Sequence, residues 1–88
     1  MESGKKRIAA AQALALEQSE RAWQVWVRVR LGAERRIDVA RAYRYRDGSA
    51  VSHVIRRLEA LAAMQTALTK RMARLRLVFD RLMSCVKS

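Results

Sequence analysis

The spacing of apolar residues between positions 51 and 62 constrains the fold of this chain more than any other feature. The stripe consists of Val51, Val54, Ile55, Leu58, Leu61 and Ala62. An α-helix with 3.6 residues per turn brings these positions onto one face, whereas a strand would need an alternating pattern. We therefore expect a helix that buries this stripe against other elements.

The remaining sequence also favours helices. Its 88 residues include three glycines and no proline, two residue types that punctuate sheet proteins more often. Residues 21–31 contain alternating valines that would suit a strand, but the chain offers no second strand to pair with it. We predict an all-α fold, a small helical domain spanning residues 1–88, in which Trp23 and Trp26 belong to the core and do not stack on bases.

A helix-turn-helix is predicted for residues 34–63. Residues 34–44 have short helical periodicity, with Ile37 and Ala40 on one face. A polar turn follows, in which we expect Gly48 to supply a positive φ and either Asp47 or Ser49 to cap the next helix. Gly32 is expected to end the preceding helix in the left-handed conformation. The recognition helix would then cover about residues 49–62.

A second apolar pattern predicts a long amphipathic C-terminal helix over residues 64–86. Its members step by three or four positions and are Leu61, Met64, Leu68, Met72, Leu75, Phe79, Leu82 and Val86. Such a stripe either packs on the core of its own domain or forms the seam of a coiled coil. The sequence leaves both interpretations open, so a homodimer through the Leu61–Val86 stripe is one of the expected partners.

The charge indicates a polyanionic partner. The formal net charge is +11, with fifteen arginines and four lysines, and such a field attracts nucleic acid first and anionic membrane surfaces second. The alternative is an arginine-rich protein whose basic faces are merely solvated.

The exposed face predicted for residues 49–62 carries the candidate DNA-binding residues. They are Ser49, Ser52, His53, Arg56 and Arg57, with no carboxylate before Glu59. An arginine can bind guanine in the major groove or a phosphate; its alternative role here is an ion pair with Glu59 or Glu20. Arg44 and Arg46 flank the turn and are expected to bind phosphates.

The turn and the helix after it resemble the C-terminal DNA-binding domain of the bacterial chromosomal replication initiator, DnaA. That family has the motif Gly-Arg-Asp-His-Thr-Thr-Val-Leu-His-Ala, followed by a basic pair and Ile-Glu. This chain has Tyr45-Arg46-Asp47-Gly48-Ser49-Ala50-Val51-Ser52-His53-Val54, then Arg56-Arg57-Leu58-Glu59. The Tyr-Arg-Asp-Gly-Ser run is more similar still to the DnaA-like helix-turn-helix of REP-associated transposase-like proteins.

This resemblance implies binding of double-stranded DNA, with Asp47 and Ser49 at positions that contact bases and phosphates in the family. Gly48 and Ala50 depart from the family's His and Thr, so we expect sequence preference to rest more heavily on Ser52, His53 and Arg56, together with Ser49. The resemblance covers about residues 21–72. The initiator's ATPase domain and the transposase's catalytic domain have no counterpart.

Other classes of function are less compatible with the sequence. One histidine and one cysteine, Cys85, cannot build a four-ligand zinc site, and no apolar run reaches the roughly 20 residues that cross a bilayer. We predict no catalysis, no cofactor, no metal, no small-molecule substrate and no membrane partner, and a cytoplasmic, nucleoid-associated protein that regulates genes or mobile elements. The alternative is a helical interaction module that dimerises; peripheral membrane binding by the C-terminal helix ranks third.

Overall fold

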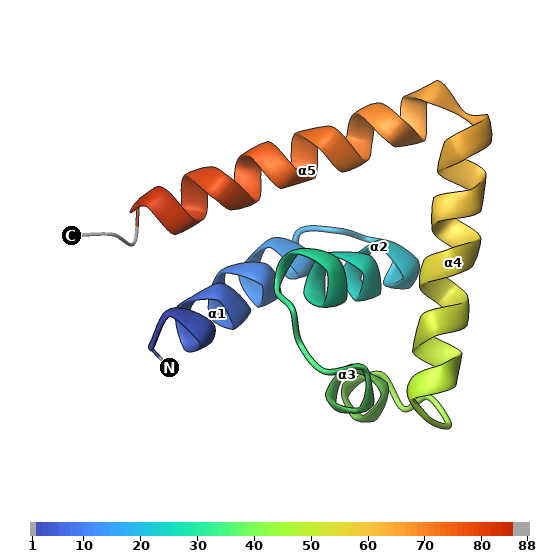
Figure 1. Ribbon diagram of the computed structural model, residues 1–88, viewed down its shortest axis with the longest axis horizontal. Coiled ribbons are helices and arrows are strands. Elements are labelled where there is room, and N and C mark those ends of the chain that lie inside the picture. The colour runs from blue at the N-terminus through green and yellow to red at the C-terminus, as the bar shows by residue number, and fades with distance from the viewer. Residues whose placement is uncertain (1, 86–88) are drawn as a thin grey trace.

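The structure, a computed structural model, describes residues 2–85, and Figure 1 shows a helical fold. The elements are α1 (Glu2–Leu16), α2 (Arg21–Trp26), the π-helical η1 (Val27–Leu31), α3 (Arg36–Ala42), α4 (Gly48–Met64) and α5 (Thr66–Cys85). No strand occurs among the described residues, which confirms the prediction of an all-α fold.

Helix α2 and η1 run into one another and form the centre of the fold, with α1, α4 and α5 packed around them. Their buried residues are Trp23, Val25, Trp26, Val27, Val29 and Leu31. A helix that is apolar nearly all round is stable only when its neighbours enclose it. This explains why the valine-rich run forms a helix despite its strand-like alternation. Trp23 and Trp26 are in the core, as predicted, with their rings edge to face and 6.0 Å apart.

The end of η1 differs from the prediction made for Gly32. Gly32 has a φ of −81°, and the left-handed residue is its neighbour Ala33, with a φ of 58°. A Cβ on Gly32 would lie 2.5 Å from Cβ of Ala11 and 2.7 Å from the carbonyl oxygen of Arg28. Glycine is therefore needed here because the end of η1 approaches α1 closely.

The turn between α3 and α4 also has its left-handed residue at another position than predicted. Arg44 has a φ of 60°, while Gly48 is the first residue of α4 and has no positive φ. The backbone N–H groups of Tyr45 and Arg44 donate to the carbonyls of Ala40 and Arg41. This is the bonding of a Schellman motif, which ends α3 and turns the chain toward α4.

A side chain of this turn caps α4, and α3 buries two residues against the rest of the fold. Asp47 is the N-cap of α4, since its Oδ1 accepts a hydrogen bond from the N–H of Ala50 at 3.2 Å; Ser49 is not the cap. In α3, Val39 and Ala40 are buried, whereas Ile37 is 39% exposed. Ile37 and Ala40, which helical spacing places on one face, therefore differ in burial.

The chain bends sharply between α4 and α5, and Figure 1 shows α5 turning back across α1 and α2. Gln65 adopts extended backbone angles (φ −126°, ψ 112°), so the pattern from Leu61 to Val86 does not form one helix. Leu61 and Met64 are 46% and 84% exposed at this corner. The predicted burial of Leu61 is therefore wrong, although the rest of the stripe on α4 is buried or half-buried.

Most of the apolar face of α5 packs within the molecule. Leu75 and Phe79 are buried in the same cluster as the core of α1 and η1, and Leu68, Met72 and Leu82 pack against that cluster. Of the two interpretations of this stripe, the described part of it follows the first, packing on its own domain. Val86 lies outside the described residues.

Candidate nucleic-acid interface

The exposed face of α4 brings three predicted residues together. His53, Arg56 and Arg57 are exposed and, with Ala60, line a shallow depression of about 350 Å³. Ser49 is exposed one turn earlier, and Ser52 is half-buried at the edge of this face. The face exists because Val51, Ile55, Leu58 and Ala62 turn the opposite side of the helix into the core.

Glu59, the only carboxylate of α4, is held away from this face. Its oxygens accept one hydrogen bond from Nε1 of Trp26 at 3.0 Å and two from Arg30 at 2.9 and 3.0 Å. Burial opposes ionisation of Glu59, but the hydrogen bonds from Arg30 and Trp26 outweigh it and keep the pKa of this carboxyl below its usual value. Glu59 is therefore ionised at neutral pH and bound to the central helix.

The ion pairs that could have neutralised Arg56 and Arg57 are not formed. Glu59 pairs with Arg30, and Glu20 pairs with Arg71 at 3.3 Å. Among the side chains of residues 5–84, neither Arg56 nor Arg57 has an ion-pair partner. We refer to these two residues as the α4 arginines. Their charges face solvent, and the one carboxylate of α4, Glu59, is paired with Arg30.

The turn that precedes α4 is supported from behind by two tyrosines. The hydroxyl of Tyr43 donates to Oε1 of Gln24 at 2.8 Å, and the Tyr43 and Tyr45 rings lie 6.4 Å apart. Arg44 and Arg46, at the predicted phosphate-binding positions, are both exposed. The tyrosines thus attach the turn to α2 while its arginines face outward.

Three further arginines near the turn were not among the predicted site residues. The guanidinium of Arg21 lies over the Tyr45 ring at 5.9 Å, and Arg36 and Arg41 are exposed on α3. The pattern around the recognition helix could not show Arg21, because 24 positions separate it from Tyr45 and only the fold brings them together. Arg36 and Arg41 could have been inferred from their place in the first helix of the pair.

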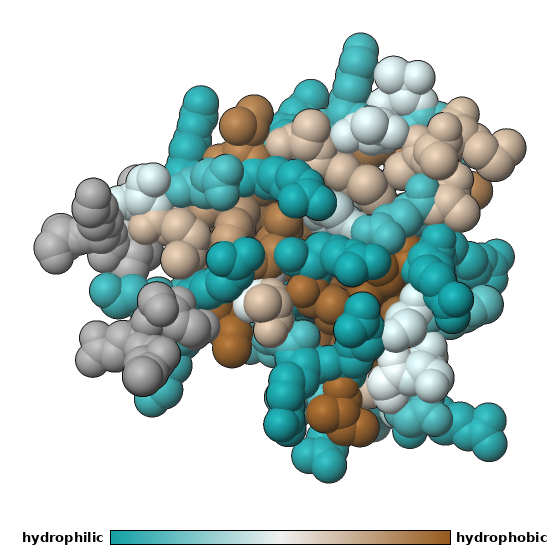
Figure 2. Space-filling view, in the orientation of Figure 1, coloured by the Kyte–Doolittle hydropathy of each residue, from teal (hydrophilic) through white to brown (hydrophobic). Residues whose placement is uncertain are grey.

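The acids of this region leave its positive charge largely uncompensated. Asp38 pairs with Arg35 at 3.2 Å, Asp47 caps α4 and Glu59 pairs with Arg30. In the view of Figure 2, hydrophilic side chains project from much of the outline and also cross the middle, with hydrophobic ones visible between them. The arrangement is a cationic surface built on a helix and a turn, suited to an extended anionic partner.

The described residues offer little to other kinds of site. They contain no group of three His, Cys, Asp or Glu side chains that could hold a metal ion. Within the same residues, every helix is too short or too polar to cross a membrane.

Comparison with known proteins identified no relative: no protein-family model, curated protein or solved structure matches this chain.

Proposed function

We propose that this protein binds double-stranded DNA with the α3–α4 pair, and that α4 enters the major groove. One observation carries the proposal. The α4 arginines lie beside His53 on an exposed helix face, while the only carboxylate of that helix is bound by Arg30 and Trp26. A helix fits the major groove of B-DNA, which is about 12 Å wide.

The parts of the surface would contribute differently. Arg56 and Arg57 can each bind the O6 and N7 atoms of guanine or a phosphate, and His53 can donate to either. The turn arginines Arg44 and Arg46 would hold the backbone and fix the orientation of α4. Asp47 would act indirectly, because its carboxylate stabilises the start of α4.

The resemblance of residues 45–59 to DnaA-like helix-turn-helix domains supports this proposal. The same resemblance suggests a regulatory or mobile-element-associated protein without catalysis, acting on the nucleoid in the cytoplasm. Gly48 and Ala50 lack the groups found at these positions in the initiator family, so we expect only modest sequence preference.

Charge reversal of the α4 arginines tests the proposal. Arg56→Glu with Arg57→Glu is expected to lower the affinity for a short mixed-sequence duplex by about 100-fold or more, because two contacts become repulsive. Fluorescence anisotropy at low salt measures the affinity, and circular dichroism checks the fold. The matched control is Lys5→Glu with Lys6→Glu, which changes the same charge on exposed residues of α1. Equal affinities for the two variants would contradict the proposal.

A second candidate function is self-association at the corner between α4 and α5. Leu61 and Met64 are exposed there. Leu61 borders a groove of about 250 Å³ whose other lining residues are Ala22, Val54, Arg57 and Leu58. Exposed apolar residues of this kind favour a protein contact. A dimer contact at this corner takes the place of a seam along the whole Leu61–Val86 stripe, because the central residues of that stripe are packed inside the molecule. Light scattering of the protein and of Leu61→Ser with Met64→Ser would detect such a dimer and its loss.

A further inference from the structure

A second cationic surface lies on α5. It consists of Lys70, Arg74 and Arg81, the α5 cations, which are all exposed. Their spacing of four and seven positions places them on one flank of the helix. Among the described residues none of them belongs to an ion pair. Asp80, the only acid of α5, precedes Arg81 and points about 100° away around the helix.

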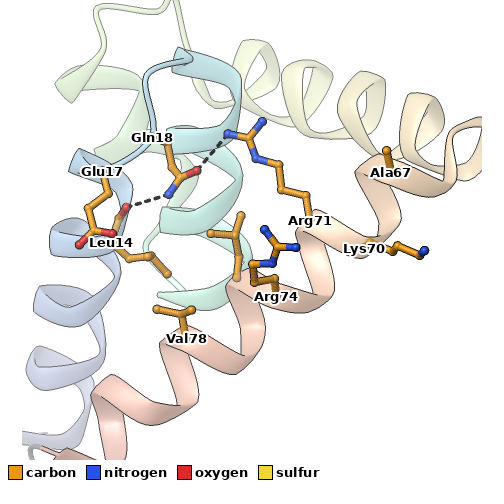
Figure 3. A pocket seen from close by; sticks show the side chains of 9 residues that line it. Leu14, Glu17, Gln18, Ala67, Lys70, Arg71, Arg74 and Val78 are labelled. Carbon is orange, nitrogen blue, oxygen red and sulfur yellow. Dashed lines mark hydrogen bonds between the residues drawn. The ribbon is translucent and has the colours of Figure 1, made fainter.

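Part of this flank borders a groove between α5 and the end of α1. The groove has a volume of about 550 Å³ and is lined by Leu14, Glu17, Gln18, Ala67, Lys70, Arg71, Arg74, Leu75 and Val78. Figure 3 shows Arg71 reaching toward Gln18, which follows α1, and Lys70 directed away from α1. Glu17 is the one carboxylate in this lining, so the cations predominate.

Arg71 differs from the α5 cations because it is fixed in place. It donates to Oε1 of Gln18 at 3.0 Å, pairs with Glu20 at 3.3 Å and lies over the Trp23 ring at 4.2 Å. These contacts attach α5 to the start of α2 and partly neutralise Arg71. Lys70 and Arg74 are left to determine the charge of the outer flank.

The α5 cations and the DNA-binding face proposed above lie at different edges of the molecule. In Figure 1, α3 and the start of α4 are at the lower edge, and α5 runs along the upper edge. The molecule measures 38 × 30 × 19 Å along its principal axes. A duplex held by the turn and the first half of α4 would therefore lie away from the α5 flank, which stays open to another anion.

We propose that the α5 cations bind the backbone of a second DNA duplex, so that one molecule bridges two duplexes. The inference rests on the proposed function of α4. The α5 cations extend over about 16 Å of helix, a length that several successive phosphates can match. Among the described residues on this flank only Leu77 is a large, well-exposed apolar side chain, whereas protein interfaces have apolar cores and are depleted in lysine.

A two-duplex capture assay tests the inference. One duplex is attached to beads, the protein is added, and the recovery of a second, fluorescent duplex is measured; anisotropy with one duplex is measured in parallel. Lys70→Glu with Arg74→Glu is expected to lower recovery by about tenfold or more, since attraction becomes repulsion, while the affinity for one duplex changes by less than about threefold. The control Lys5→Glu with Lys6→Glu is expected to change neither the recovery of the second duplex nor the affinity for one duplex.

Each outcome decides the inference. If the wild-type protein binds one duplex but recovers no second one, bridging is wrong and the proposed function of α4 stands. If it binds no duplex at all, both proposals fail. If Lys70→Glu with Arg74→Glu recovers as much as the wild type, the second duplex is held by another surface or by a second copy of the chain, and the inference is overturned.

Two further results complete the test. If Lys70→Glu with Arg74→Glu weakens the binding of a single duplex as much as it lowers recovery of the second, α5 contacts the same duplex as α4. That result also overturns bridging. Lys70→Gln with Arg74→Gln removes the positive charges without adding carboxylates. This milder variant is expected to reduce recovery by about threefold to tenfold, and unchanged recovery would contradict the inference even if the reversed variant failed to fold.

Discussion

The arginines of η1 and those of α4 have the same chemistry and opposite surroundings. Arg28 donates to both oxygens of Glu34 at 2.7 and 3.0 Å, and Arg30 donates to both oxygens of Glu59 at 2.9 and 3.0 Å. The α4 arginines face solvent and pair with no carboxylate of residues 5–84. Residue type alone therefore does not tell which arginines of this chain are held in ion pairs.

The difference depends on distance from the core. The side chain of Arg28 is 16% exposed and pairs with Glu34, whereas that of Arg30 is 38% exposed and reaches Glu59 of α4. The hydrogen bond to Glu34 raises the pKa of Arg28 above its usual value despite burial. Arg56 and Arg57 are exposed, and Arg57 borders a groove that Ala22 of α2 also lines, so both charges are open to a partner. Substitutions in the ion pairs of η1 should therefore change stability, whereas substitutions of the α4 arginines should change the affinity for a partner.

The largest effect on stability is expected from Glu34→Ala. This change leaves Arg28, whose side chain is 16% exposed, without its carboxylate, and removing one partner of such a pair costs about 2–4 kcal/mol. Urea unfolding measures the loss. Glu17→Ala is the control, because Glu17 is exposed and forms no ion pair with the described side chains; it should cost no more than about 0.5 kcal/mol. If Glu34→Ala and Glu17→Ala lower the free energy of unfolding equally, the pair of Arg28 with Glu34 does not stabilise the fold.

Glu59→Ala should have the next largest effect. Trp26 is 1% exposed, and its N–H would lose its acceptor, at a cost of about 1–3 kcal/mol. Glu59→Gln keeps an acceptor oxygen and should cost less. If both variants unfold at the same urea concentration, the hydrogen bond from Trp26 contributes little.

The same carboxylate gives the fold a pH dependence. The pKa of Glu59 is lowered in the folded state, so its contribution to stability is present above the unfolded value of about 4.3 and is lost as the pH falls through the folded value. Thermal unfolding between neutral and acid pH should show a smaller acid loss for Glu59→Gln than for the wild type. Identical pH profiles would contradict this assignment.

The smallest effect on stability is expected from the α4 arginines themselves. Arg56→Ala and Arg57→Ala should each change the free energy of unfolding by no more than about 0.5 kcal/mol, because exposed side chains outside the packed core contribute little. Thermal unfolding of the two variants measures this. A loss as large as that of Glu34→Ala would show that the α4 arginines are structural, and the contrast with η1 would disappear.

The parts of the fold that sequence could predict depend on local spacing. The buried stripe of α4 and the apolar face of α5 follow from helical periodicity. The change to a second apolar pattern predicts a new helix from about residue 64, but not the sharp bend at Gln65, where the sequence has neither glycine nor proline. Because glycine adopts a positive φ most easily, the sequence favours Gly32 and Gly48 for the left-handed positions, which the structure has at Ala33 and Arg44.

The candidate site was predictable to a similar extent. Arg56, Arg57 and His53 are near one another in sequence, so one helix brings them together. The pairing that removes Glu59 from this face joins it to Arg30, 29 positions away, and only the tertiary fold provides it. Sequence therefore indicated the cations of the surface but not the reason why they remain available.

The most direct test of the central claim is the salt dependence of duplex binding. With about five to seven phosphate contacts, the slope of log K against log salt should be near −4.5 to −6 for the wild type. For Arg56→Ala with Arg57→Ala, the slope should become shallower by about 1.8 if each arginine contacts a phosphate, while the thermal unfolding stays near that of the wild type. Failure of the wild type to bind duplex DNA even at low salt would contradict the account, as would affinities and slopes that are identical in the two proteins.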